Sequence, residues 1–62
     1  MIYLRDVLRI LPRSQTIKVY DEYGTLLFFN QVWANDDKYM LSCPVTELDR
    51  RFNIVYITIS YL

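Results

Sequence analysis

Few side chains in this 62-residue chain could take part in chemistry. The chain has no histidine, so the commonest general base and metal ligand is absent. Its single glycine excludes the glycine-rich loops that bind phosphates or expose a nucleophilic serine. Two pairs of adjacent carboxylates, Asp21-Glu22 and Asp36-Asp37, lie in polar stretches typical of turns. Because a divalent cation needs several converging oxygen ligands, we expect no metal site, no cofactor and no enzymatic activity.

Cys43 is the one cysteine, which excludes an internal disulfide and the usual zinc sites. It lies in an apolar segment without a cationic neighbour in sequence, and this favours a buried structural thiol over a reactive one. An unpaired cysteine is typical of the reducing cytoplasm. The longest clean apolar run, residues 26–29, is far shorter than the roughly 20 residues that span a bilayer. We therefore expect a cytoplasmic protein that does not associate with membranes.

Arginine accounts for most of the positive charge, and its planar fork suits carboxylates and phosphates. Arg5 and Arg9 share one face of a predicted helix, and Arg50 and Arg51 lie in a predicted charged turn over 49–53. These four arginines are either solvated charges paired with nearby acidic residues or an anion-binding site. Seven basic and seven acidic residues cancel, so we expect no DNA binding. Net neutrality also removes a repulsion that keeps small proteins apart.

Aromatic residues make up 16% of the chain and suggest a second feature of its surface. Tyr20 and Tyr56 fall on the strand faces opposite the predicted core, and Phe29 and Trp33 are close to them in sequence. The simplest interpretation is that tyrosine favours strands. Alternatively, these residues form an aromatic face for association with a partner, or a platform that stacks nucleobases. Tyr20, Phe29, Trp33 and Tyr56 are the candidate interface residues.

The hydrophobic pattern predicts the elements that position these side chains. Residues 3–11 show helical spacing and end at Pro12, although no capping residue precedes Tyr3. Beyond Pro12 the period becomes that of strands, and Gly24 closes a hairpin turn over 21–24. The run at 26–29 does not alternate, which indicates a strand covered on both sides. The expected strands are 15–21, 25–30, 39–47 (interrupted by Pro44) and 54–61.

This order predicts a single α+β domain over 1–62, with one N-terminal helix packed on a mostly antiparallel four-stranded sheet. The predicted core consists of the apolar helix face with Ile17, Val19, Val55, Ile57 and Ile59. A chain this short buries only about 60% of its surface. Its apolar content, 53% of residues, exceeds what one helix can cover.

The pattern of a helix ending in Leu11-Pro12, followed by an Asp21-x-x-Gly24 hairpin and a final strand over 54–59, is familiar. It resembles small, mostly uncharacterised proteins encoded by bacteriophages and prophages. The resemblance implies an accessory role inside a bacterial host, such as blocking a defence protein or sequestering a signalling nucleotide. No functional residue of that group can be assigned to a position in this chain.

Taken together, these observations favour a non-enzymatic binding protein of phage or prophage type that acts as a homo-oligomer and binds a host protein. One alternative is an oligomeric sponge in which Arg50, Arg51 and aromatic rings hold an anionic nucleotide. Another alternative is a structural subunit of a larger assembly.

Overall fold

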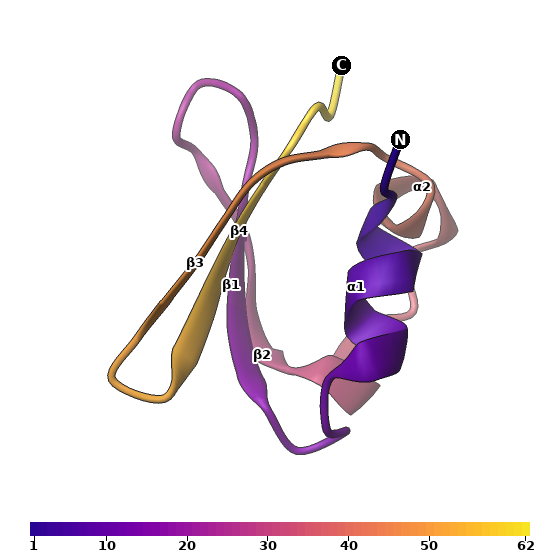
Figure 1. Cartoon of the computed structure of the whole chain (residues 1–62). Helices are drawn as coiled ribbons and strands as arrows, with labels where there is room; N and C mark the ends of the chain where they lie inside the picture. Colours follow the sequence, from indigo (N-terminus) through magenta and orange to yellow (C-terminus); the bar gives the residue numbers. More distant parts are fainter.

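A computed structural model describes all 62 residues and has the predicted α+β architecture with one four-stranded sheet (Figure 1). The sequence prediction lacked two short helical segments and misplaced one strand, all between the second strand and the last. The elements, in chain order, are α1 (Leu4–Ile10), β1 (Thr16–Tyr20), β2 (Leu26–Gln31), the 3-10 turn η1 (Val32–Ala34), α2 (Lys38–Leu41), β3 (Val45–Arg51) and β4 (Ile54–Ile59). Neither α-helix is long and apolar enough to cross a bilayer.

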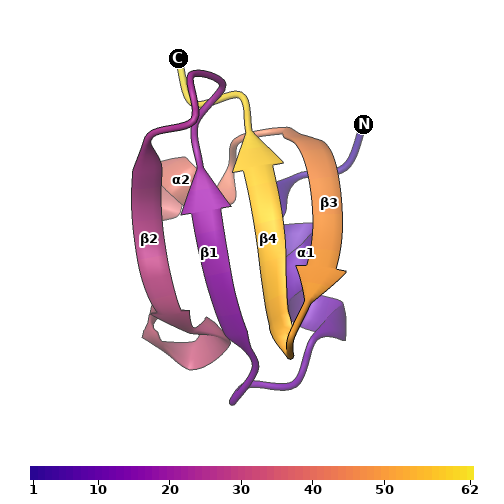
Figure 2. The ribbon, with the colours of Figure 1, turned by 90° about the vertical axis from the view of Figure 1, so that its left-hand side faces the viewer.

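The sheet is mixed, with strand order β2-β1-β4-β3. Each outer strand forms an antiparallel hairpin with its inner neighbour, and the two inner strands, β1 and β4, run parallel. Parallel neighbours need a crossover connection, which here includes β2, η1, α2 and β3. Figure 2 shows the sheet from the side opposite the helices, with β2 and β3 at its edges.

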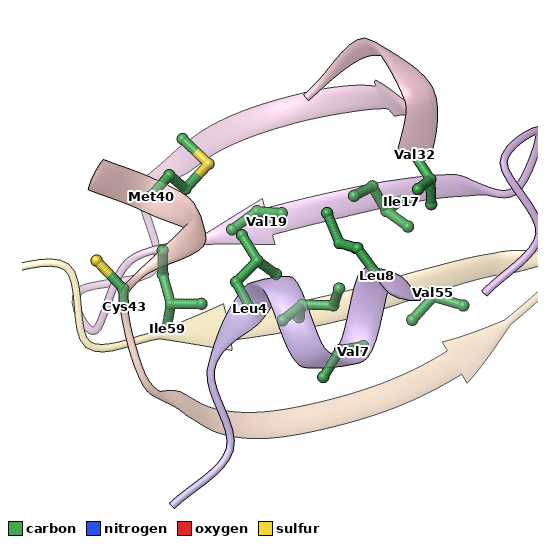
Figure 3. Packing of buried hydrophobic residues seen from close by; sticks show 11 residues of the cluster. Leu4, Val7, Leu8, Ile17, Val19, Val32, Met40, Cys43, Val55 and Ile59 are labelled. Carbon is green, nitrogen blue, oxygen red and sulfur yellow. The ribbon is translucent and has the colours of Figure 1, made fainter. Parts of the chain in front are cut away.

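The core lies between α1 and one face of the sheet (Figure 3). All five strand residues predicted for it are buried, because alternate residues of β1 and β4 point to the same side. The helix contributes its predicted stripe. The full set of buried residues is Leu4, Val7, Leu8, Ile17, Val19, Val32, Met40, Cys43, Val55, Ile57 and Ile59.

The start of α1 is held by hydrogen bonds, although it has no conventional capping residue. The backbone N–H of Tyr3 donates to the Asp6 carboxylate at 3.0 Å. The N–H of Leu4 donates to the carbonyl of Cys43 at 2.9 Å, which ties the first turn to the segment before β3. These bonds supply acceptors for N–H groups that have no partner within the helix at its N-terminus.

The first hairpin turn has the predicted chemistry. The Asp21 carboxylate accepts hydrogen bonds from the N–H groups of Tyr23 and Thr25, each at 2.9 Å. Gly24 has a φ of 83°, a left-handed conformation that favours glycine. The turn is therefore encoded locally by its aspartate and its glycine.

The predicted strand over 39–47 and the predicted turn over 49–53 are only partly right, because only residues 45–47 of the first lie in a strand and only residues 52–53 of the second form the turn. Residues 38–41 form α2, whose first N–H groups are capped by the Asp37 side chain, and β3 starts only after Pro44. The chain reverses later, at Phe52 and Asn53, which both have positive φ values. No alternation marks β3, because six of its seven residues are exposed on an edge strand.

The prediction that the second strand is covered on both sides is also wrong, because Leu26, Phe29 and Asn30 of β2 are exposed. Tyr20 lies opposite Leu26 and Val19 opposite Phe28, so Leu27 is an extra residue in a bulge. The bulge places both Leu27 and Phe28 against the core, whereas Leu26 and Phe29 remain about half exposed. The bulge, rather than burial of both faces, explains the missing alternation.

Candidate binding surface

The sheet face that points away from α1 is uncovered, and we call it the open face (Figure 2). Strand alternation places on it the side chains that lie between the core positions of β1 and β4, together with their cross-strand neighbours. Its residues are Thr16, Lys18, Tyr20, Leu26, Phe29, Gln31, Glu47, Asp49, Arg51, Ile54, Tyr56 and Thr58.

Aromatic rings and cations alternate across all four strands of the open face. Lys18 of β1 lies opposite Phe29 of β2 and Tyr56 of β4 in the register of the sheet. Its Nζ atom is 4.6 Å from the centre of the Phe29 ring and 5.5 Å from that of Tyr56. The guanidinium carbon of Arg51, on β3, is 4.6 Å from the centre of the Tyr56 ring. These are cation–π distances, and each exposed contact contributes about 0.5–1 kcal/mol.

Tyr20 and Tyr56 form a stacked pair on the two inner strands of this surface. Their ring centres are 6.5 Å apart and their planes differ by 8°. Both residues lie on the inner strands, so the backbone of the sheet holds the pair in place. Two rigid aromatic side chains presented in this way supply contact area at low entropic cost.

A hollow of about 240 Å³ lies next to this pair and carries charges of both signs. Arg51 forms an ion pair with Asp49, at 3.3 Å between Nε and the carboxylate, but both side chains are largely exposed and the pair adds little stability. The residues that line the hollow are Tyr20, Glu47, Leu48, Asp49, Arg51, Tyr56 and Thr58.

The structure brings together three of the four predicted interface residues. Tyr20 and Tyr56 stack, and Phe29 is linked to Tyr56 through Lys18. Trp33 lies beyond the end of β2 in η1, where its ring N–H donates to the Gln31 side chain. Sequence reasoning missed Lys18, although its place between Ile17 and Val19 was the signal that it shares a face with Tyr20.

The four candidate anion-binding arginines are not brought together. Arg51 lies on the open face, whereas Arg50 is opposite Val55 on the other side of β3 and lines a groove beside α1. On α1, Arg5 lies over the ring of Tyr3, at 5.4 Å from its centre, and Arg9 is exposed in the last turn. Because strand neighbours point to opposite faces, adjacent arginines cannot share one ligand here.

Cys43 is buried, as predicted, and its thiol donates a hydrogen bond to the carbonyl of Tyr39 at 3.3 Å. Burial raises the pKa of this thiol, and the carboxylates of Asp37 and Glu22 raise it further. The thiol therefore stays protonated at neutral pH, which opposes nucleophilic reactivity.

Three of the four paired carboxylates accept hydrogen bonds within the chain. Asp21 holds the first hairpin turn, Glu22 accepts a hydrogen bond from the N–H of Tyr61 at 2.9 Å, and Asp37 caps α2.

Comparison of the chain with protein-family models, with curated proteins and with solved structures gives no match. The case for a function therefore rests on the open face.

Proposed function

We propose that the protein is a small non-enzymatic binding protein that acts as a homo-oligomer and contacts a protein partner through its open face. The observation that carries the proposal is the stacked Tyr20–Tyr56 pair on the two inner strands of the sheet, whose open face no other element covers. Tyrosine and arginine are enriched among residues that dominate binding energy at interfaces. The open face presents both, in contact with one another.

The setting that we propose follows the sequence resemblance: a phage or prophage protein in the bacterial cytoplasm that binds a host protein of a defence system. A partner with carboxylates near an aromatic or aliphatic anchor complements this surface. Lys18 and Arg51 then pair with its charges while the tyrosine rings contact the apolar group.

The partner-binding part of the proposal is tested by capture from host lysate with the wild-type chain and two variants. Tyr56→Asp places a charge at the centre of the open face, whereas Tyr23→Asp makes the same change in the first hairpin turn, where Tyr23 is 76% exposed. We expect a defined host protein to be retained by the wild type and by Tyr23→Asp, and to be lost with Tyr56→Asp. Equal retention by all three chains contradicts a role for the open face.

A second candidate function, sequestration of an anionic nucleotide, is favoured by one observation. Lys18 and Arg51 lie beside aromatic rings, so a base can stack while a phosphate meets a cation. Glu47 and Asp49 in the same hollow oppose this role. Thermal shift with cyclic and adenosine-derived nucleotides separates the two functions. A rise in Tm that Arg51→Ala abolishes supports sequestration, and no rise with any nucleotide excludes it.

A further inference from the structure

The two edges of the sheet are chemically unlike. The outer strand β3 carries four charged residues in seven and follows Pro44, and the Asp49 carboxylate accepts a hydrogen bond from the Arg50 N–H at 2.8 Å. The outer strand β2, with the sequence Leu-Leu-Phe-Phe-Asn-Gln, carries no charge. Charges and proline are the features that keep edge strands from pairing with other chains. Only β3 has them.

The hydrogen bonds of the first hairpin show which backbone groups of β2 are free. The N–H of Val32 donates to the carbonyl of Gln15 at 2.9 Å, so this pair is hydrogen-bonded. Because bonded and non-bonded pairs alternate along an antiparallel ladder, Lys18 and Phe29, three positions further along, are a non-bonded pair. The N–H and carbonyl of Phe29 therefore point away from β1, towards the side where the sheet has no further strand.

Gln31 is the next residue of β2, towards η1, whose backbone groups point away from β1, and its N–H already has a partner. The N–H of Gln31 is not free to donate to a further strand, because it donates to the Asn30 side chain at 2.7 Å. On the other side of Phe29 the bulge at Leu27 interrupts the ladder. Phe29 is thus the point on β2 where a free donor and a free acceptor stand together, next to a ring that is 54% exposed.

We propose that two copies of the chain associate through β2, antiparallel, about a two-fold axis at Phe29. In this arrangement each Phe29 donates its N–H to the other copy's carbonyl, which closes one hydrogen-bonded pair. The two rings lie side by side on the open face, where a cross-strand aromatic pair adds stability. The two sheets become continuous, and the neutral strands meet without repulsion.

This inference rests on the proposed homo-oligomer and specifies its interface. Stacking of two open faces is disfavoured, because the charge of Lys18 lies among the rings at the centre of the face and would lose its water. Pairing through β3 would bring together two edge strands that each carry four charged residues, which disfavours association. Pairing through β2 leaves Tyr20, Tyr56 and Arg51 of both copies free for a partner.

The test is sedimentation of the full chain across the micromolar range, with a matched pair of variants. Phe29→Lys places two like charges across the two-fold axis, whereas Phe52→Lys makes the same substitution in the turn after β3, where Phe52 is 93% exposed. We expect Phe29→Lys to weaken the dimer by about tenfold or more and Phe52→Lys to leave it nearly unchanged. Circular dichroism verifies that both variants are folded.

The outcomes separate this inference from the proposed function. A wild-type oligomer that is lost with Phe29→Lys supports pairing through β2. A wild-type oligomer that survives Phe29→Lys but is lost with Tyr56→Asp overturns it and assigns the interface to the open face. A wild-type chain that is monomeric at every concentration refutes the proposed homo-oligomer and, with it, pairing through β2. If Phe29→Lys does not fold, hydrogen exchange of wild-type Phe29 decides, because pairing through β2 requires its amide protection to rise with concentration and constant protection refutes it.

Discussion

The replacement Ile57→Ala tests whether the core has the composition that the structure assigns to it. Ile57 is 0% exposed and lies between Val19 of β1 and Leu48 of β3 in the register of the sheet. Its strand is one of the two inner strands, so the surrounding backbone cannot easily collapse into the space that the substitution leaves.

The expected loss follows from this burial. Truncation of a fully buried isoleucine to alanine costs about 2–5 kcal/mol of unfolding free energy. A single core in a chain of this size supplies about 3–5 kcal/mol in total. Ile57→Ala therefore removes about half of the stability or more, which corresponds to a fall in Tm of at least about 8 °C.

Urea unfolding followed by circular dichroism measures the loss, at one fixed protein concentration because association would couple stability to concentration. Ile10→Ala is the matched control. Ile10 is 82% exposed on α1, and alanine is the better helix former, so this variant should stay within about 0.5 kcal/mol of the wild type. A loss below about 1 kcal/mol for Ile57→Ala, or equal losses for the two variants, would refute the assigned core.

Three further changes test local features. Gly24→Ala should lower the unfolding free energy by about 1 kcal/mol, because the backbone is left-handed there while no atom lies within 4 Å of the added methyl group. A lower Tm measures this loss, and an unchanged Tm would contradict the left-handed turn. Phe52→Asn should raise the unfolding free energy by up to about 1 kcal/mol, because Phe52 is exposed with a φ of 51° and asparagine tolerates this conformation; a loss in urea titrations would argue against the second turn. Burial, Asp37 and Glu22 hold the pKa of Cys43 above its ordinary value of 9.0 in the folded chain, so the unfolded chain releases this proton first and stability falls as pH rises above 9.0. Cys43→Ala should flatten that fall in urea titrations at increasing pH, and an identical slope in both chains would show that Cys43 is not the group responsible.

The sequence predicted the elements whose burial alternates regularly. Ile17, Val19, Val55, Ile57 and Ile59 were assigned to the core because apolar residues recur at every second position of these two segments. The alternation is regular because β1 and β4 each have one face against α1. The first turn was predictable because Asp21 and Gly24 act within a few residues of each other. Such local signals survive in a single sequence because they do not depend on which strand lies next to which.

The errors occurred where tertiary position determines the pattern. The strand β3 has almost no buried residue, so its seven residues show no period, and α2 is too short for helical spacing to be visible. The bulge at Leu27 made an edge strand look like a buried one. On the open face, Arg50 and Arg51 were grouped because they are adjacent, whereas strand geometry separates them. Lys18 was overlooked because only the sheet brings Phe29 and Tyr56 next to it.

The most direct test of the central claim, that this is a self-associating binding protein, is the mass of the wild-type chain in solution. Sedimentation equilibrium over the micromolar range measures it without labels or variants. We predict a weight-average mass that rises with concentration from that of the 7.5 kDa chain to at least twice that value. A constant mass of 7.5 kDa at every concentration would contradict the account.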